Sequence, residues 1–191
     1  MAIQKFGTVA FGTVAIVLHW AIAALIVIAV ASGLITAGAK EIDLSRATLV
    51  VHQSFGLIIF TLAVVRITWR LTHPAPPLPP TTTLQQRWAA TVTHGSLYLL
   101  TFFMPLAGYT GLAARGRVIS LFGVFELPQG EFRDFDLART AQEVHVSLQY
   151  VLYALVAAHV IAALYHQFVI RDGLLWRMWF RNGPAQTSSQ G

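Results

Sequence analysis

Cysteine is absent from the 191-residue sequence, and charged residues are scarce at 11%. The absence of cysteine excludes disulfides, thiolate metal sites, iron–sulfur clusters and the thioether attachment of c-type haem. Soluble domains carry about a quarter charged residues, so this chain is too poor in charge for that class. A hydrophobic share of 55% and a mean hydropathy of +0.62 indicate a membrane protein instead.

Four apolar stretches predict an all-α integral membrane protein, because each reaches the roughly 20 residues that a helix needs to cross hydrocarbon. They lie at about 14–36, 49–71, 88–112 and 144–170. We expect one four-helix bundle over 1–183, followed by a disordered tail at 184–191. A proline-rich connection at 73–80 separates the second and third stretches, and a longer polar loop at about 113–143 separates the third and fourth.

The basic balance of the chain suggests membrane topology rather than a nucleic-acid partner. The net charge is +5 and the pI is near 10.1, but no motif interleaves basic and aromatic residues, so we expect no nucleic acid. Four spans put both termini on one side of the membrane. Lys and Arg divide almost equally between the two sides, which barely discriminates the two orientations. We place both termini in the cytoplasm.

Seven histidines are the metal-capable side chains, and four of them fall at two matched depths. His52 and His145 lie near the outer starts of the second and fourth helices, and His19 lies near the cytoplasmic start of the first. His159 follows His145 by fourteen residues, which is about 21 Å deeper and about 40° around the helix axis. We call His52 and His145 the outer pair, and His19 and His159 the inner pair.

Two facing imidazoles at one depth are what six-coordinate haem iron requires, because the porphyrin occupies the equatorial positions. The two pairs therefore predict two stacked haems, non-covalent and of b type. The alternative is a set of polar side chains satisfied within a bundle. Ionisable residues in membrane spans are costly and rare, so four of them at two depths favour ligation.

Small residues accompany these histidines and could leave room for a macrocycle. The same residues would also suit close helix–helix packing in a membrane, and the sequence leaves both interpretations open. They are Gly12, Gly33, Ser54, Gly56, Gly108 and Gly111.

Two arginines of the second helix are candidates to pair with haem propionates. Arg66 follows His52 by fourteen residues and should reach the level of the inner pair, and Arg70 lies one turn nearer the cytoplasm. For both arginines, and for Arg70 above all, an ordinary positive end of a membrane helix is the alternative.

Two further histidines lie toward the cytoplasmic ends of their helices. His94 is near the start of the third helix, with Arg87 two turns before it, and His166 follows His159 by seven residues. All three are candidates for binding a quinone headgroup, and the histidines could also supply its protons. Interfacial histidines without a role are the alternative. His73, in the proline-rich connection, is expected to be solvated.

The chain resembles the bacterial cytochrome b561 family over nearly its whole length. The motifs that carry the resemblance are Leu18-His19-Trp20, His52-Gln-Ser-Phe-Gly56, Val65-Arg66, Trp69-Arg70, His94-Gly-Ser-Leu-Tyr, Pro105-Leu-Ala-Gly108, Glu143-Val-His145, His159, His166 and the ending from Arg171 to Met178. The resemblance implies a dihaem cytochrome of the bacterial inner membrane with His19, His52, His145 and His159 as haem ligands. Family members pass electrons between the outer face and the quinone pool, and one kind oxidises superoxide while reducing ubiquinone.

The leading hypothesis is thus a quinone-reducing oxidoreductase that takes electrons from superoxide or another periplasmic donor. Basic residues on the outer side could steer superoxide by positive potential, and they are Lys40, Arg46, Arg115, Arg117 and Arg139. Seven acidic residues on the same side weaken this effect. The alternative is a haem-bearing anchor subunit that relays electrons from a docked dehydrogenase or hydrogenase. A third hypothesis is a haem-free histidine-lined transporter.

Overall fold

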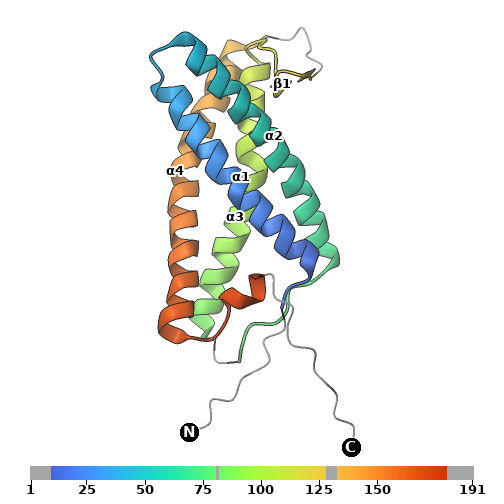
Figure 1. Cartoon of the computed structure of the whole chain (residues 1–191), viewed down its shortest axis with the longest axis vertical. Coiled ribbons are helices and arrows are strands. Elements are labelled where there is room, and N and C mark those ends of the chain that lie inside the picture. Colours follow the sequence, from blue (N-terminus) through green and yellow to red (C-terminus); the bar gives the residue numbers. More distant parts are fainter. Residues whose placement is uncertain (1–9, 81, 128–132, 180–191) are drawn as a thin grey trace, which may run out of the picture.

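The computed structural model describes residues 10–80, 82–127 and 133–179, which form a bundle of four long helices (Figure 1). The helices are α1 (Thr13–Gly38), α2 (Ile42–Thr72), α3 (Leu84–Ala113) and α4 (Phe135–Tyr165). Each is long and apolar enough to cross a membrane. Because α1 begins and α4 ends at the same end of the bundle, the connectivity agrees with the expected four spans.

Three helices, α2, α3 and α4, begin at least four residues before their apolar runs, and local capping explains the starts of α3 and α4. α4 begins nine residues before the expected position because the Asp134 side chain accepts a hydrogen bond from the Leu137 amide at 2.9 Å. α2 begins seven residues before the expected position. At about 1.5 Å per residue, helices of 31 residues exceed the roughly 30 Å of hydrocarbon, so polar turns extend beyond it.

α3 and the end of α2 follow the ordinary rules of helix termination. Thr83 and Gln86 form a reciprocal capping box at the start of α3. α2 ends immediately before His73, which precedes Pro74. The His73 ring stacks on Trp69 at 3.7 Å and is exposed, in line with the expected solvated position.

A short antiparallel hairpin, which the sequence did not predict, interrupts the connection between α3 and α4. Its strands are β1 (Ser120–Leu121) and β2 (Phe125–Glu126). The fully buried hydroxyl of Ser54 accepts a hydrogen bond from the Phe122 amide at 2.7 Å, and Gln53 Nε2 donates to the Ser120 carbonyl at 3.1 Å. The hairpin is therefore attached to α2 directly beside His52.

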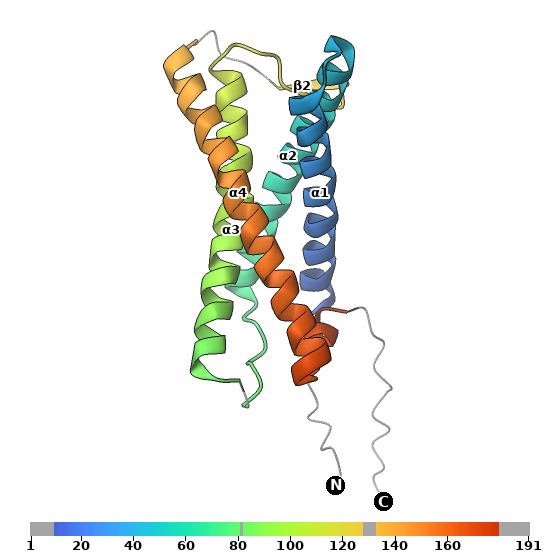
Figure 2. The same ribbon diagram turned by 90° about the vertical axis from the view of Figure 1, so that its left-hand side faces the viewer.

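The bundle consists of two helical hairpins, α1–α2 and α3–α4, which lie side by side (Figure 2). α4 crosses the bundle so that its last turns lie close to the first turns of α1, and this crossing brings His159 next to His19. The outer pair also joins the two halves, because His52 belongs to α2 and His145 to α4.

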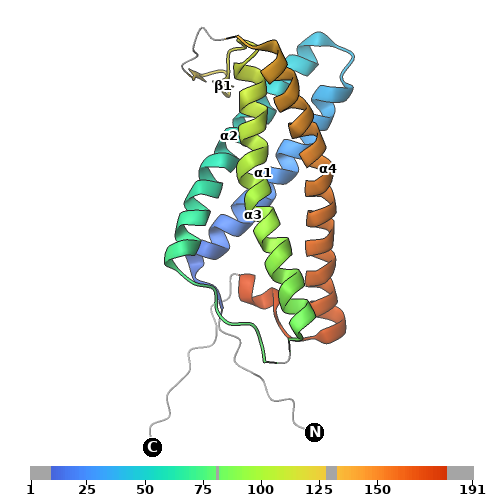
Figure 3. The ribbon, with the colours of Figure 1, turned by 180° about the vertical axis from the view of Figure 1, so that it is seen from behind.

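The chain after α4 turns back beneath the bundle (Figure 3). A π-helical turn, His166–Ile170, leads to a 3-10 helix, Leu175–Met178. Trp20 Nε1 donates to the Met178 carbonyl at 2.7 Å, so this segment packs against α1 one residue from His19. The predicted tail at 184–191 lies outside the described residues.

Candidate functional site

The outer pair faces across the bundle with the spacing that a shared metal ion would need. The ring centroids of His52 and His145 are 5.9 Å apart and the ring planes are perpendicular, at 90°. A metal–imidazole bond is about 2 Å. With about 1 Å from each ring centre to its nitrogen, two axial imidazoles on one iron should have centroids about 6 Å apart.

Backbone carbonyls fix the tautomer of both outer histidines. His52 Nδ1 lies 2.8 Å from the Ala29 carbonyl, and His145 Nδ1 lies 2.9 Å from the Met104 carbonyl. A carbonyl only accepts, so each Nδ1 carries the proton and donates. Each Nε2 therefore keeps its lone pair for a metal, which is the usual arrangement around ligating histidines.

Two glycines make room for these rings. A Cβ atom at Gly33 would lie 2.9 Å from atoms of the His52 ring, and one at Gly108 would lie 3.0 Å from His145 Nδ1. These glycines lie four residues after the carbonyls of Ala29 and Met104, respectively. Each first helix thus offers a notch, made of one carbonyl and one glycine, that holds the imidazole of the following helix.

A cavity of about 420 Å³ surrounds the outer pair. Most of its lining is aliphatic, and Arg115 and Arg117 also contribute to it. Apolar walls with a few cations suit a porphyrin, which has a flat apolar ring and anionic propionates. The residues around the outer pair therefore fit a b haem, which would supply a one-electron carrier at this position.

The other small residues divide between the two interpretations left open by the sequence. Gly56 lines the cavity, and nothing lies within 4 Å of a Cβ built on it. Gly111 packs against α4 instead, and Gly12 has open space around it. Ser54 forms a hydrogen bond with the hairpin and does not line the cavity.

The inner pair has similar spacing but a different environment. The His19 and His159 ring centroids are 6.1 Å apart, with planes at 73°. Arg66 Nη2 lies 3.1 Å from His19 Nδ1, and its guanidinium lies over the Tyr98 ring at 5.3 Å. Arg66 therefore reaches the level that the sequence predicted, where it contacts a proposed ligand directly. A guanidinium only donates, so His19 Nδ1 accepts here and the proton of the neutral ring lies on Nε2, unlike in the outer pair. Binding of a metal by His19 Nε2 would require the proton to move to Nδ1 and the Arg66 contact to change. Arg70, one turn further, is exposed.

His94 joins the inner pair, which the depth argument did not predict. Its ring centroid is 5.3 Å from that of His159. This is shorter than the roughly 6 Å expected for two ligands of one iron, so His19 is the better partner for His159. His94 is also exposed on the bundle. It thus combines access from outside with proximity to a proposed haem ligand.

His166 has a carboxylate partner that sequence reasoning missed. Its Nδ1 lies 2.5 Å from Asp172 Oδ2, and the other carboxylate oxygen accepts from the Leu174 amide at 3.1 Å. The side chains are only 16% and 12% exposed. Burial lowers the pKa of nearby Arg177, and the charge of Asp172 opposes that shift. Arg87, the third quinone candidate, is exposed and donates to the Thr82 carbonyl.

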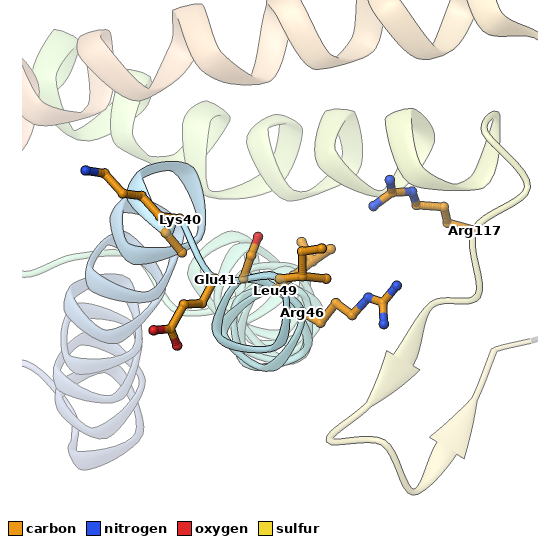
Figure 4. Close-up of a pocket in the computed structure, with 8 residues that line it drawn as sticks. Lys40, Glu41, Arg46, Leu49 and Arg117 are labelled. Atoms are coloured by element: carbon orange, nitrogen blue, oxygen red, sulfur yellow. The ribbon is translucent and has the colours of Figure 1, made fainter.

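A second pocket, of about 350 Å³, adjoins the cavity of the outer pair (Figure 4). Ser45, Leu49 and Arg117 line both spaces. Lys40, Arg46 and Arg117 give this pocket three cations against the single acid Glu41. Arg46 and Arg117 lie on its hairpin side, whereas Lys40 and Glu41 extend from the opposite side. Arg139, by contrast, pairs with Glu143 on the exposed face of α4.

Four helices long and apolar enough to span a membrane, with histidines paired between them, match the architecture of a membrane cytochrome b. The chain belongs to the prokaryotic cytochrome b561 family, whose pattern it matches over residues 10–181. It is 32% identical over 161 residues to a probable superoxide oxidase CybB of Yersinia pestis, an alignment that covers 84% of this chain and 90% of that protein.

Two proteins of Escherichia coli strain K12 are also similar. Cytochrome b561 homolog 2 is 34% identical over 127 residues, covering 66% of this chain and 68% of the relative. Cytochrome b561 homolog 1 is 27% identical over 172 residues, covering 88% and 96%. The chain is therefore a multi-pass bacterial membrane protein of an electron-transferring, b-haem-binding family.

Proposed function

We propose that the chain binds two b haems and moves electrons from a donor on the outer side of the inner membrane to ubiquinone near the cytoplasmic side. The outer pair would hold one haem and the inner pair the other. The observation that carries this proposal is the spacing of the two pairs, 5.9 Å and 6.1 Å between ring centroids. In this orientation the hairpin faces the periplasm and both termini are cytoplasmic.

Superoxide is the donor that the outer surface favours. The pocket with Lys40, Arg46 and Arg117 adjoins the cavity of the outer pair, so a small anion drawn by these cations arrives beside the proposed electron entry point. The name of the Yersinia pestis relative agrees with such a donor. The donor transfers one electron and leaves as oxygen, and no side chain needs to act as a nucleophile.

The test is a haem count followed by a rapid-mixing experiment on the purified protein in lipid nanodiscs. We expect two haems per chain by the pyridine method, all extractable because the chain has no cysteine. A superoxide source should reduce haem, and added ubiquinone should reoxidise it. One haem per chain would contradict the two-site proposal, and reduction only by a docked dehydrogenase would contradict superoxide as donor.

The second expected result concerns the quinone end. The proposed quinone-binding groups are His94, His166 and Arg87. Ubiquinone takes up two protons with the two electrons that reduce it. A buried His166–Asp172 pair at this end of the bundle is therefore suited to proton delivery. We expect His166→Gln to slow reoxidation of haem by ubiquinone about 10²- to 10⁴-fold, the range for losing a positioned general acid.

The haem content of His166→Gln should stay at two, because His166 is not a proposed ligand. Reduction by superoxide should also be unchanged, since it occurs at the other end of the bundle. His73→Gln, in the exposed connection after α2, is the control histidine. Unchanged reoxidation in His94→Gln, His166→Gln and the double variant would place quinone elsewhere.

A further inference from the structure

The two helical hairpins repeat one pattern of residues. In α1, His19 precedes Gly33 by fourteen residues, and in α3, His94 precedes Gly108 by fourteen. In α2, His52 precedes Arg66 by fourteen residues, and in α4 the same interval separates the outer ligand His145 from His159. A serine also follows the outer histidine by two positions in each of these helices, Ser54 in α2 and Ser147 in α4.

The contacts repeat as well as the intervals. The Ala29 carbonyl, ten residues after His19, accepts a hydrogen bond from His52 Nδ1. The Met104 carbonyl, ten residues after His94, accepts one from His145 Nδ1 in the same way. In each half, the glycine four residues later meets the same imidazole.

At the inner level, the first-helix histidine again contacts the equivalent second-helix residue. His19 contacts Arg66 in one half, and His94 contacts His159 in the other. α1–α2 and α3–α4 are thus two copies of one unit, and their equivalent outer histidines form the outer pair.

The copies differ in charge at one inner position. Arg66 occupies in α2 the place that His159 occupies in α4. The outer level is symmetric in its ligands, since His52 and His145 are equivalent and each donates to a carbonyl. The inner level therefore carries a fixed positive charge in contact with one ligand of its pair, and the outer ligands have no such contact among the hydrogen bonds of the described residues.

We infer that Arg66 makes the inner haem the easier of the two to reduce, and so makes the transfer of an electron from the outer haem to the inner haem favourable. This inference rests on the proposed function. Reduction of iron from Fe³⁺ to Fe²⁺ removes one positive charge. A cation held nearby in a medium of low dielectric therefore stabilises the reduced form, whether it touches the ligand or pairs with a propionate.

With a haem held at each pair, the step would be a one-electron exchange, in which the outer site would be oxidised and the inner site reduced by the same electron. No proton or further reactant is needed. Arg115 and Arg117 also line the outer cavity, but they border the solvent-facing pocket or the loop beyond α3, where water and salt screen their charge. Arg66 lies within the membrane-spanning part of α2, where screening is weaker.

The test is a spectroelectrochemical titration of the purified holoprotein, with haem content measured first. In the wild type, the inner haem should titrate at the higher potential. It is identified in His145→Ala, which should keep the inner haem alone. Arg66→Gln should lower the inner midpoint and leave the outer midpoint unchanged, whereas Arg66→Lys, which keeps the charge, should stay near the wild type. Arg70→Gln is the matched control and should produce a smaller shift.

Two results would overturn the inference. One is a wild-type inner haem that titrates at or below the outer haem, and this measurement decides even if Arg66→Gln loses haem. The other is an Arg66→Gln protein with two haems and an unmoved inner midpoint. A wild type with one haem, or a His145→Ala protein with none, would instead show that the proposed function is wrong in its ligand assignment.

Discussion

Replacing His145 with alanine should reduce the haem content from two per chain to one. The outer haem would lose one of its two proposed ligands, the imidazole that the carbonyl of Met104 and the notch at Gly108 hold in place. The inner haem should remain, since the two proposed sites share no ligand. Reduction of the remaining haem by superoxide should be nearly abolished, because the entry point near the cationic pocket is gone.

The pyridine assay and the reduced spectrum measure this result directly. His52→Ala should give the same spectrum as His145→Ala, and the double variant should look like either single variant. His166→Ala, in the turn that follows α4, is the matched control and should keep both haems. If His145→Ala removed the inner haem and kept the outer one, the pairing by depth would be wrong.

The four spans could be predicted from the sequence because length and hydropathy alone decide whether a helix can cross a membrane. The start of α4 could not be predicted in the same way. Its first turns hold Asp136, Arg139 and Glu143, which lack apolar character, so only the cap at Asp134 marks the start. The β1–β2 hairpin was missed because two-residue strands leave almost no alternating pattern to detect.

The pairing of histidines by depth was accessible from the sequence, since the rise per residue of a helix is nearly constant. Partners that depend on how helices rotate and cross were not accessible. The contact of His94 with His159 follows from the crossing of α4 over the bundle, and the pair His166–Asp172 follows from a π-helical turn. The repeated interval of fourteen residues was present in the sequence and could have revealed the two copies.

Adding a methyl group at Gly33 or Gly108 should weaken the outer haem selectively. At Gly33 the new Cβ would lie 2.9 Å from the His52 ring, closer than Cβ atoms come in proteins, and at Gly108 it would lie 3.0 Å from His145 Nδ1, a contact tight enough that the ring must move. Each imidazole ring also donates a hydrogen bond to a carbonyl on the helix that carries the glycine, so the ring cannot shift without stretching that bond. Overpacking of this kind costs about 1–3 kcal/mol. That cost corresponds to roughly 5- to 150-fold weaker haem binding if it falls on the bound state.

Two glycines in the same helices provide matched controls. A Cβ at Gly111 would make ordinary contacts of 3.5 Å or more, and one at Gly38 would meet nothing within 4 Å. We expect Gly33→Ala and Gly108→Ala to lose the outer haem faster than the wild type when apomyoglobin is added as a haem acceptor. Gly38→Ala and Gly111→Ala should lose it at the wild-type rate. Equal loss rates in all four variants would mean that the outer imidazoles are not held by the glycine notches, and faster loss of the inner haem in Gly108→Ala would assign His145 to the other site.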